Sequence, residues 1–243
     1  MPRYFLEVSY KGTRYSGFQV QQNAQTIQGE IEKALQTYFR QTVELTGSSR
    51  TDAGVHALQN FFHFDWNNPF PEKVIYNLNA ILPDDIVIKS LKSVKPDAHC
   101  RFDAVSRTYH YSVYQSKNPF LFETAYFFPY TLDFEKMQQA ASIIMGYTDF
   151  TSFCKRNTQV KTHNCTILQS EWIKMDDRLI YKVTANRFLR GMVRALTATM
   201  LKVGRGKISL EDFKNIIEIK DCTKAFFDTP AHGLLLKEVG FHY

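Results

Sequence analysis

Hydrophobic and polar side chains alternate over residues 3–10, which predicts a strand with one buried face. Over residues 26–39 the apolar positions change to helical spacing, and Thr26 stands where an N-cap residue belongs. Two strands, a helix bounded by prolines and another strand are predicted next, at residues 43–45, 58–66, 71–83 and 85–94. The order β-α-β-β-α-β is typical of the ferredoxin-like fold, in which helices cover one face of an antiparallel sheet.

A similar order of elements begins again beyond residue 103. The pattern predicts a strand, a helix with Asp133 as its N-cap, a hairpin, two more helices and a last strand, at residues 107–115, 132–146, 165–185, 188–203, 209–220 and 233–241. We therefore predict an α+β protein of two halves, 1–103 and 104–243. No linker rich in Pro, Gly or Ser divides the halves, so we expect them to pack closely.

Composition favours a polyanionic partner without requiring one. The 243 residues include 30 Lys and Arg against 24 Asp and Glu, a net charge of +6, together with 20 Phe and 13 Tyr. Aromatic rings fill cores and can also stack on nucleobases, whereas a weakly basic soluble enzyme has the same charge balance. The four cysteines have no zinc-ligand spacing, and no stretch reads as a signal peptide or membrane span. These features predict a soluble, intracellular protein.

The stretch TGSSRTDAGVHA, at Thr46–Ala57, has little to bury and carries one carboxylate, Asp52, two residues after Arg50. One interpretation is a connecting loop in which Asp52 serves as a turn residue. The other is a loop that presents a reactive carboxylate. His56 lies four residues further on, but no Ser or Cys partner for a hydrolase triad stands at comparable spacing, and the scattered histidines match no metal-ligand pattern.

Three arginines mark the helix predicted over 188–203. Arg187, Arg190 and Arg194 fall on the side opposite its apolar positions, provided that helical phasing extends back to Arg187. Such a ridge is either a solvated charged face or a surface that contacts phosphates, with one arginine turned inward to hold a carboxylate.

Tyrosines recur on the strand predicted over 107–115. Tyr109 and Tyr111 share one face of this strand, and arginines precede it in the sequence HCRFDAVSRTYHY. The two rings are either core residues whose hydroxyl groups find a partner, or a platform on which a base stacks. The residues alone leave both interpretations open.

Several segments, in the same order, resemble motifs of the tRNA pseudouridine synthase A family. GSSRTDAGVHAL is similar to the family's catalytic signature, with its R-T-D-A-G-V-H core intact at Arg50–His56. SYKGTRYSGFQVQ, NLNAILPDDI, HCRFDAVSRTYHY, GYTDFTSF and NRFLRGMVR resemble further family motifs, so the likeness spans nearly the whole chain. It departs at Lys11, Phe18 and Val20, where the family usually has Asp, Trp and Arg. These three positions bear on fine RNA contacts and leave the reaction unaffected.

The resemblance implies a pseudouridine synthase fold, in which two ferredoxin-like (RRM-like) halves form a mostly antiparallel sheet flanked by helices, with the active cleft between them. It implies an isomerase that flips uridines out of the anticodon stem-loop of tRNA, at positions 38, 39 and 40, and converts them to pseudouridine. No group enters or leaves, so no cofactor and no metal are expected. The implied partners are tRNA and a second copy of the chain, in the cytoplasm and away from membranes.

The resemblance also implies roles for four residues. Asp52 is the catalytic carboxylate, which attacks C1′ or assists formation of a glycal, with attack at C6 as an older proposal. Arg194 holds this carboxylate, Tyr109 lies against the uracil, and Arg50 enters the place that the flipped nucleotide leaves. The alternatives are a synthase acting on another RNA and a catalytically inactive RNA-binding relative. A hydrolase with an Asp nucleophile lacks a recognisable base or metal set.

Overall fold

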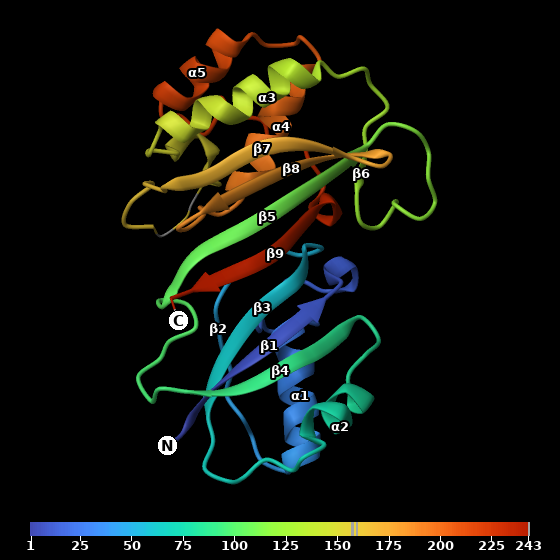
Figure 1. The fold of residues 1–243 in the computed structure, drawn as a ribbon, viewed down its shortest axis with the longest axis vertical. Coiled ribbons are helices and arrows are strands. Elements are labelled where there is room, and N and C mark those ends of the chain that lie inside the picture. The colour runs from blue at the N-terminus through green and yellow to red at the C-terminus, as the bar shows by residue number, and fades with distance from the viewer. Residues whose placement is uncertain (157, 159, 243) are drawn as a thin grey trace. The chain divides into compact units, whose positions relative to one another are not determined.

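The computed structural model describes residues 1–156, 158 and 160–242 (Figure 1). Within them the strands are β1 (Arg3–Tyr10), β2 (Thr46–Gly47), β3 (His56–Asp65), β4 (Ile86–Val94), β5 (Ala104–Tyr114), β6 (Tyr126–Phe127), β7 (Ile167–Met175), β8 (Arg178–Ala185) and β9 (Leu234–Phe241). The α-helices are α1 (Ile27–Phe39), α2 (Val74–Ile81), α3 (Phe134–Ile143), α4 (Met192–Gly204) and α5 (Leu210–Glu218). The predicted α+β class is confirmed.

The chain forms two compact units, one made of Met1–Val105 and Leu235–Tyr243, the other of Ser106–Leu234. The division predicted from the sequence, 1–103 and 104–243, assigned the last strand to the second half. In the structure, most of β9 belongs to the first unit, because it pairs in parallel with the start of β3 and the Phe241 ring packs on two aromatic rings of that unit.

The first unit has the predicted β-α-β-β-α-β order. Strands β4, β1 and β3 pair antiparallel in that order, and β2 adds to β3. Helices α1 and α2 lie on one side of these strands (Figure 1). Thr26 caps α1 as predicted, since its hydroxyl oxygen accepts a hydrogen bond from the Gly29 N–H.

The second strand of this unit differs from its prediction at residues 43–45. The strand is Thr46–Gly47 instead, although Val43 and Leu45 are buried as their pattern required. Side chains of α1 replace the sheet ladder there. The Leu45 N–H donates to Glu32 at 3.1 Å, and its carbonyl accepts from Gln28 at 2.9 Å. Apolar alternation therefore identified burial correctly and strand pairing wrongly.

The second unit pairs β5, β8 and β7 antiparallel, with β6 beside β5 in parallel. The predicted hairpin is confirmed, because β7 and β8 meet at the Met175–Arg178 pair. Helices α3, α4 and α5 gather on one side of β7 and β8 (Figure 1). Asp133 caps α3 as predicted, and a capping box of Ser209 and Asp212 begins α5.

The start of α4 corrects the helix predicted over 188–203. The helix begins at Met192, because Gly191 adopts a left-handed conformation with φ 76° and the Arg190 carbonyl accepts a hydrogen bond from Lys155. Arg187 and Arg190 therefore precede the helix, and the predicted ridge of three arginines does not form. The predicted apolar face is buried, at Leu189, Met192, Val193, Leu196, Met200 and Val203.

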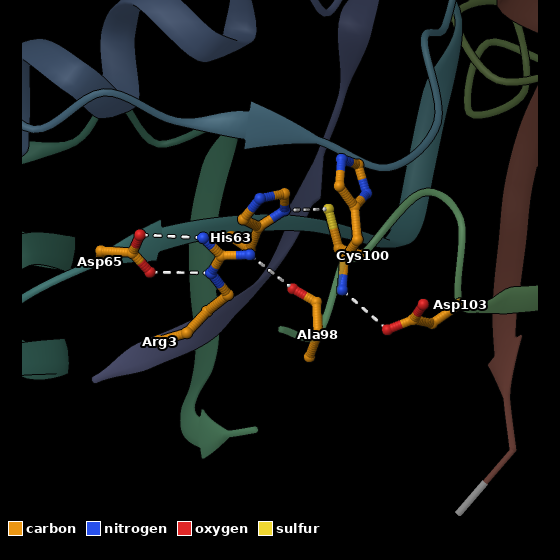
Figure 2. A network of polar contacts seen from close by, with 7 residues as sticks. Arg3, His63, Asp65, Ala98, Cys100 and Asp103 are labelled. Atoms are coloured by element: carbon orange, nitrogen blue, oxygen red, sulfur yellow. Dashed lines mark hydrogen bonds and ion pairs between the residues drawn. The ribbon is translucent and has the colours of Figure 1, made fainter. Parts of the chain in front are cut away.

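A polar network fixes the chain that follows β4 (Figure 2). Arg3 binds both carboxylate oxygens of Asp65, at 2.8 and 2.9 Å, and donates to the Ala98 carbonyl at 3.0 Å. The buried His63 ring contacts the Cys100 sulfur at 3.2 Å. Hydrogen bonds from Arg3 lower the pKa of Asp65. Burial, with the charges of His99 and Arg3, lowers the pKa of His63 to about 4.

This burial makes stability depend on pH. Between pH 6.5 and about 4 the unfolded chain protonates His63 and the folded chain does not, so stability falls as pH falls through this window. When the pH falls from 7 to 5, we expect the free energy of unfolding to decrease by about 2 kcal/mol less in the His63→Gln variant than in the unaltered chain. Urea unfolding of both proteins at the two pH values measures this difference. Parallel pH dependences would contradict it.

Candidate active site

Asp52 opens a tight turn between β2 and β3. The Val55 N–H donates to the Asp52 carbonyl at 3.1 Å, and Gly54 occupies the third position of the turn with φ 78°. A positive φ at this position favours glycine, as in a type II turn. The Asp52 side chain is half-buried. The two interpretations of this stretch are therefore compatible, since the turn itself presents the carboxylate.

A buried hydrogen-bond network holds the chain just before the turn. Asn60, fully buried on β3, donates to the Ser49 carbonyl at 2.8 Å and to the Tyr10 hydroxyl at 3.1 Å. Its side-chain oxygen accepts from the Ser49 N–H. The Tyr10 hydroxyl in turn lies 2.8 Å from the Thr51 hydroxyl. These bonds hold Ser49 and Thr51, the residues on both sides of Arg50. The Asp52 carboxylate therefore extends from a backbone whose position is fixed by hydrogen bonds.

Sequence reasoning missed Asn60 and Tyr10. A usable signal was present, because Asn60 shares its side of the strand with Phe62 and Phe64 and is the polar exception on that apolar face. A polar side chain in such a place needs partners, and here the partners are the loop backbone and a strand tyrosine.

The opening segment, residues 11–21, packs on the outer side of the same turn. The Phe18 N–H donates to the Thr51 carbonyl at 3.1 Å, and the Tyr15 carbonyl accepts from the Gly54 N–H at 3.3 Å. Gly12 donates to the His56 ring at 3.0 Å. A Cβ at Gly12 would lie 2.0 Å from the Val55 carbonyl oxygen, so only glycine permits this approach.

The position of Phe18 shows that one of the three departures from the family pattern does not concern RNA contacts. Its ring is 1% exposed and stacks on Phe62 at 4.5 Å. It also excludes any side chain at Gly47, whose Cβ would lie 2.3 Å from the ring. Phe18 is thus a core residue that touches the signature loop, rather than a position for RNA contacts. Val20, by contrast, is exposed.

Arg50 points its exposed guanidinium towards the opening segment. Its Nη1 lies 3.5 Å from the Gln19 side-chain oxygen, a weak contact near the limit of a hydrogen bond. The long side chain is therefore held loosely beside the carboxylate turn, while the backbone on either side of it is fixed by the Asn60 network. This combination suits a cation that meets a flexible polyanionic ligand.

Tyr109 belongs to the second unit, on β5 opposite Val183 of β8. Its ring is 9% exposed and meets the Phe188 ring edge-to-face at 5.2 Å. Tyr111 is fully buried, donates to the Pro230 carbonyl at 2.7 Å, and its pKa is raised by burial. The core interpretation therefore applies fully to Tyr111, whereas Tyr109 keeps a small exposed area.

Arg194 lies in the first turn of α4, also in the second unit. Its Nε and Nη2 donate to the Thr229 carbonyl at 2.9 and 2.6 Å, and the Thr229 hydroxyl donates back to the Arg194 carbonyl. Because a guanidinium carries five N–H donors, this clamp orients the group while using two of them. Arg194 lines a cavity of about 640 Å³ together with Tyr114, Phe122, Tyr126, Phe127, Phe227, Asp228, Thr229, Pro230 and His232.

The structure thus distributes the four candidate residues over both units. Asp52 and Arg50 share one loop of the first unit, and Tyr109 and Arg194 belong to the second. Among the described residues, no group of three His, Cys, Asp or Glu side chains is placed to hold a metal ion. None of the helices in the described part of the chain combines the length and apolar character of a membrane span.

Comparison with known proteins identifies the class of enzyme. A family model described as tRNA pseudouridine synthase matches residues 7–103 and 140–242. These ranges include Asp52, Arg50 and Arg194, while Tyr109 lies between them. The chain therefore belongs to the tRNA pseudouridine synthase family, whose members are isomerases, and the predicted family and enzyme class are confirmed.

Close relatives share nearly the full length of the chain. The tRNA pseudouridine synthase A of Parabacteroides distasonis is 45% identical over 99% of this chain and 96% of its own. Those of Porphyromonas gingivalis and Staphylococcus aureus strain JH1 are 45% and 41% identical over 98% of this chain, covering 97% and 90% of their own lengths.

The loop network gives a prediction about stability. Asn60→Ala would leave the Ser49 backbone groups without their buried partner and would remove one hydrogen bond of the Tyr10 hydroxyl, so we expect a loss of about 3 kcal/mol. Urea unfolding measures this loss. Asn67→Ala, at an exposed position just beyond β3, is the matched control and should change stability by less than about 0.5 kcal/mol. Equal effects of the two substitutions would contradict the role of Asn60.

Proposed function

We propose that this chain isomerises uridine to pseudouridine in the anticodon stem-loop of tRNA, at positions 38, 39 and 40. The carrying observation is the Arg50–His56 loop, whose sequence matches the family signature and whose turn presents the Asp52 carboxylate from a fixed backbone. The relatives named tRNA pseudouridine synthase A, similar over nearly the full chain, support tRNA as the substrate.

Asp52 is the nucleophile of the proposed reaction. Its carboxylate attacks C1′, or assists loss of the base as a glycal forms, and the bond from C1′ to N1 of uracil breaks. The uracil then rotates and C5 bonds to C1′ as the bond from Asp52 to C1′ breaks; along the glycal route, the proton that was removed from C2′ returns to it instead. The C5 proton is lost, and the ring nitrogen freed from C1′ takes up a proton. The composition of the uridine is unchanged, so the reaction needs no redox cofactor.

The other three candidates act on the carboxylate and the RNA. The proposal requires the two units to bring Arg194 to Asp52, where a guanidinium stabilises and aims the negative charge. The clamp on the Thr229 carbonyl, which fixes the direction of Arg194, supports this role. Tyr109 stacks on the uracil. Arg50, exposed and loosely held, enters the space of the flipped nucleotide and offsets part of the cost of flipping.

The proposed active site is the cleft between two halves of the chain, in a homodimer across which tRNA lies. The family resemblance supports the homodimer, and the exposed Phe120 and Phe122 of the second unit offer apolar surface. We place the enzyme in the cytoplasm. Its four cysteines form no disulfide with one another in the described part of the chain, which fits a reducing compartment.

Replacement of the carboxylate tests the chemistry. We expect Asp52→Asn to lower the rate of pseudouridine formation at least about 10³-fold, since the amide is not a nucleophile at this step. Binding of tRNA should change little, because the amide keeps the size of the carboxylate. Single-turnover assays and filter binding measure the two quantities. Asp84→Asn removes a charge from an exposed position outside this loop and should retain full activity.

Pseudouridine mapping tests the substrate. Total tRNA from cells with and without this chain should differ by loss of pseudouridine confined to the anticodon arm. Loss in another RNA, with tRNA unchanged, would show a synthase of different specificity. No loss anywhere, with RNA binding retained, would show a catalytically inactive binding protein.

A further inference from the structure

Asp85, directly before β4, collects three hydrogen bonds from the opening segment of the chain. Its carboxylate accepts from the Tyr15 hydroxyl at 2.6 Å and from the Arg14 Nε at 2.7 Å. Its backbone carbonyl accepts from the Lys11 N–H at 2.9 Å. The Asp85 side chain is largely buried, and Tyr15 is 3% exposed. Asp85 therefore holds both ends of the short helical turn Gly12–Arg14, through its backbone carbonyl at the start and its carboxylate at the end.

The charges at this contact favour strong hydrogen bonds. Burial opposes ionisation of Asp85, but hydrogen bonds from Arg14 and Tyr15 outweigh it and lower its pKa. Burial and the neighbouring Asp85 raise the pKa of Tyr15, so its phenol stays protonated and donates. A neutral donor on a carboxylate forms a charge-assisted bond, which is shorter and stronger than a neutral pair.

Tyr15 connects this contact to the signature loop. Its hydroxyl binds Asp85, while its carbonyl accepts from Gly54, the glycine of the turn that Asp52 opens. Three residues further along, the Phe18 N–H binds the Thr51 carbonyl, directly before Asp52. Backbone groups of the opening segment thus meet the turn on both sides of the carboxylate. The network of Asn60 supports the loop from the sheet, and Asp85 anchors the segment that supports it from outside.

We propose that Asp85 is a positioning residue for Asp52, acting through Tyr15 and the Gly54 N–H. This inference rests on the proposed function, because it concerns the placement of the catalytic carboxylate. When Asp85 loses its charge, the opening segment loosens and the turn shifts relative to the substrate. A nucleophile misplaced by roughly 1 Å can cost up to about 10²-fold in rate without loss of substrate binding.

The test separates kcat from KM for tRNA. We expect Asp85→Asn to lower kcat about 10-fold or more and to change KM less than about twofold, because the residue acts on the catalytic step alone. Asp84→Asn, the same substitution one residue earlier at an exposed position, is the matched control and should leave both constants within about twofold. Rates are expressed per folded enzyme, from unfolding curves of each variant.

Tyr15→Phe provides a second route to the same contact if Asp85→Asn folds poorly. The ring stays in the core, and the hydroxyl that reaches Asp85 is removed. We expect a similar fall in kcat. The double variant Tyr15→Phe with Asp85→Asn should lose no more than the more affected single variant, because both act through one bond. Arg14→Gln should cost less, since the Arg14 side chain is 65% exposed.

Each outcome decides between specific explanations. Equal kcat in the Asp85→Asn and Asp84→Asn variants, or additive effects in the double variant, would overturn the positioning role. A raised KM with unchanged kcat would show that Asp85 supports tRNA binding instead. If the unaltered chain forms no pseudouridine, or Asp52→Asn remains active, the proposed function itself fails, independently of Asp85.

Discussion

A single buried amide, that of Asn60, anchors the start of the signature loop to the sheet. A loop with few apolar side chains cannot be held by burial, so its backbone must be held by hydrogen bonds. The amide offers a donor and an acceptor to the Ser49 backbone and a second bond to the Tyr10 hydroxyl. Because these groups are desolvated, each unmade bond is costly, and the loop therefore has one strongly preferred arrangement.

The opening segment completes this arrangement by close backbone contact. Glycine at residue 12 lets the segment approach the Val55 carbonyl, and glycine at residue 17, with φ 108°, lies against Thr51. A Cβ at Gly12 would collide with the Val55 carbonyl, and at Gly17 the positive φ disfavours any other residue. The backbone of the loop thus contacts a polar network of the sheet on one side and the opening segment on the other, and the Asp52 side chain remains half-buried.

The sequence predicted most elements because their signals are local. Apolar spacing and capping residues located α1, α3 and the hairpin of β7 and β8. Failures came where distant contacts outweighed local pattern. Helical phasing through Arg187 and Arg190 is interrupted by Gly191, whose left-handed conformation begins α4 four residues later than predicted. Residues 43–45 are buried like a strand, but side chains of α1 satisfy their backbone.

The candidate residues likewise differ in whether their role can be predicted from neighbouring residues in the sequence or only from contacts with distant ones. Asp52, Arg50 and Arg194 stand in motifs that can be matched in the sequence, whereas Asn60 bonds to Tyr10 and Asp85 to Tyr15, which are 50 and 70 residues away along the chain. Pattern reasoning assigns polar residues of this kind to a strand face or a turn and stops there. The contribution of Asn60 and Asp85 becomes visible only when the hydrogen-bond partner of each buried polar group is identified in three dimensions.

The chain returns to the first unit at β9, after the whole of the second unit. Leu235 pairs with His56, the last residue of the signature core, so the C-terminal strand re-enters the first unit at the end of the carboxylate loop. The stretch just before it is fixed in the second unit, where Arg194 clamps the Thr229 carbonyl and Tyr111 binds that of Pro230. Only a short length of chain separates the clamped carbonyl from the strand beside His56. A chain that ended before β9 would keep every candidate residue and lose the strand that pairs with the end of the signature core.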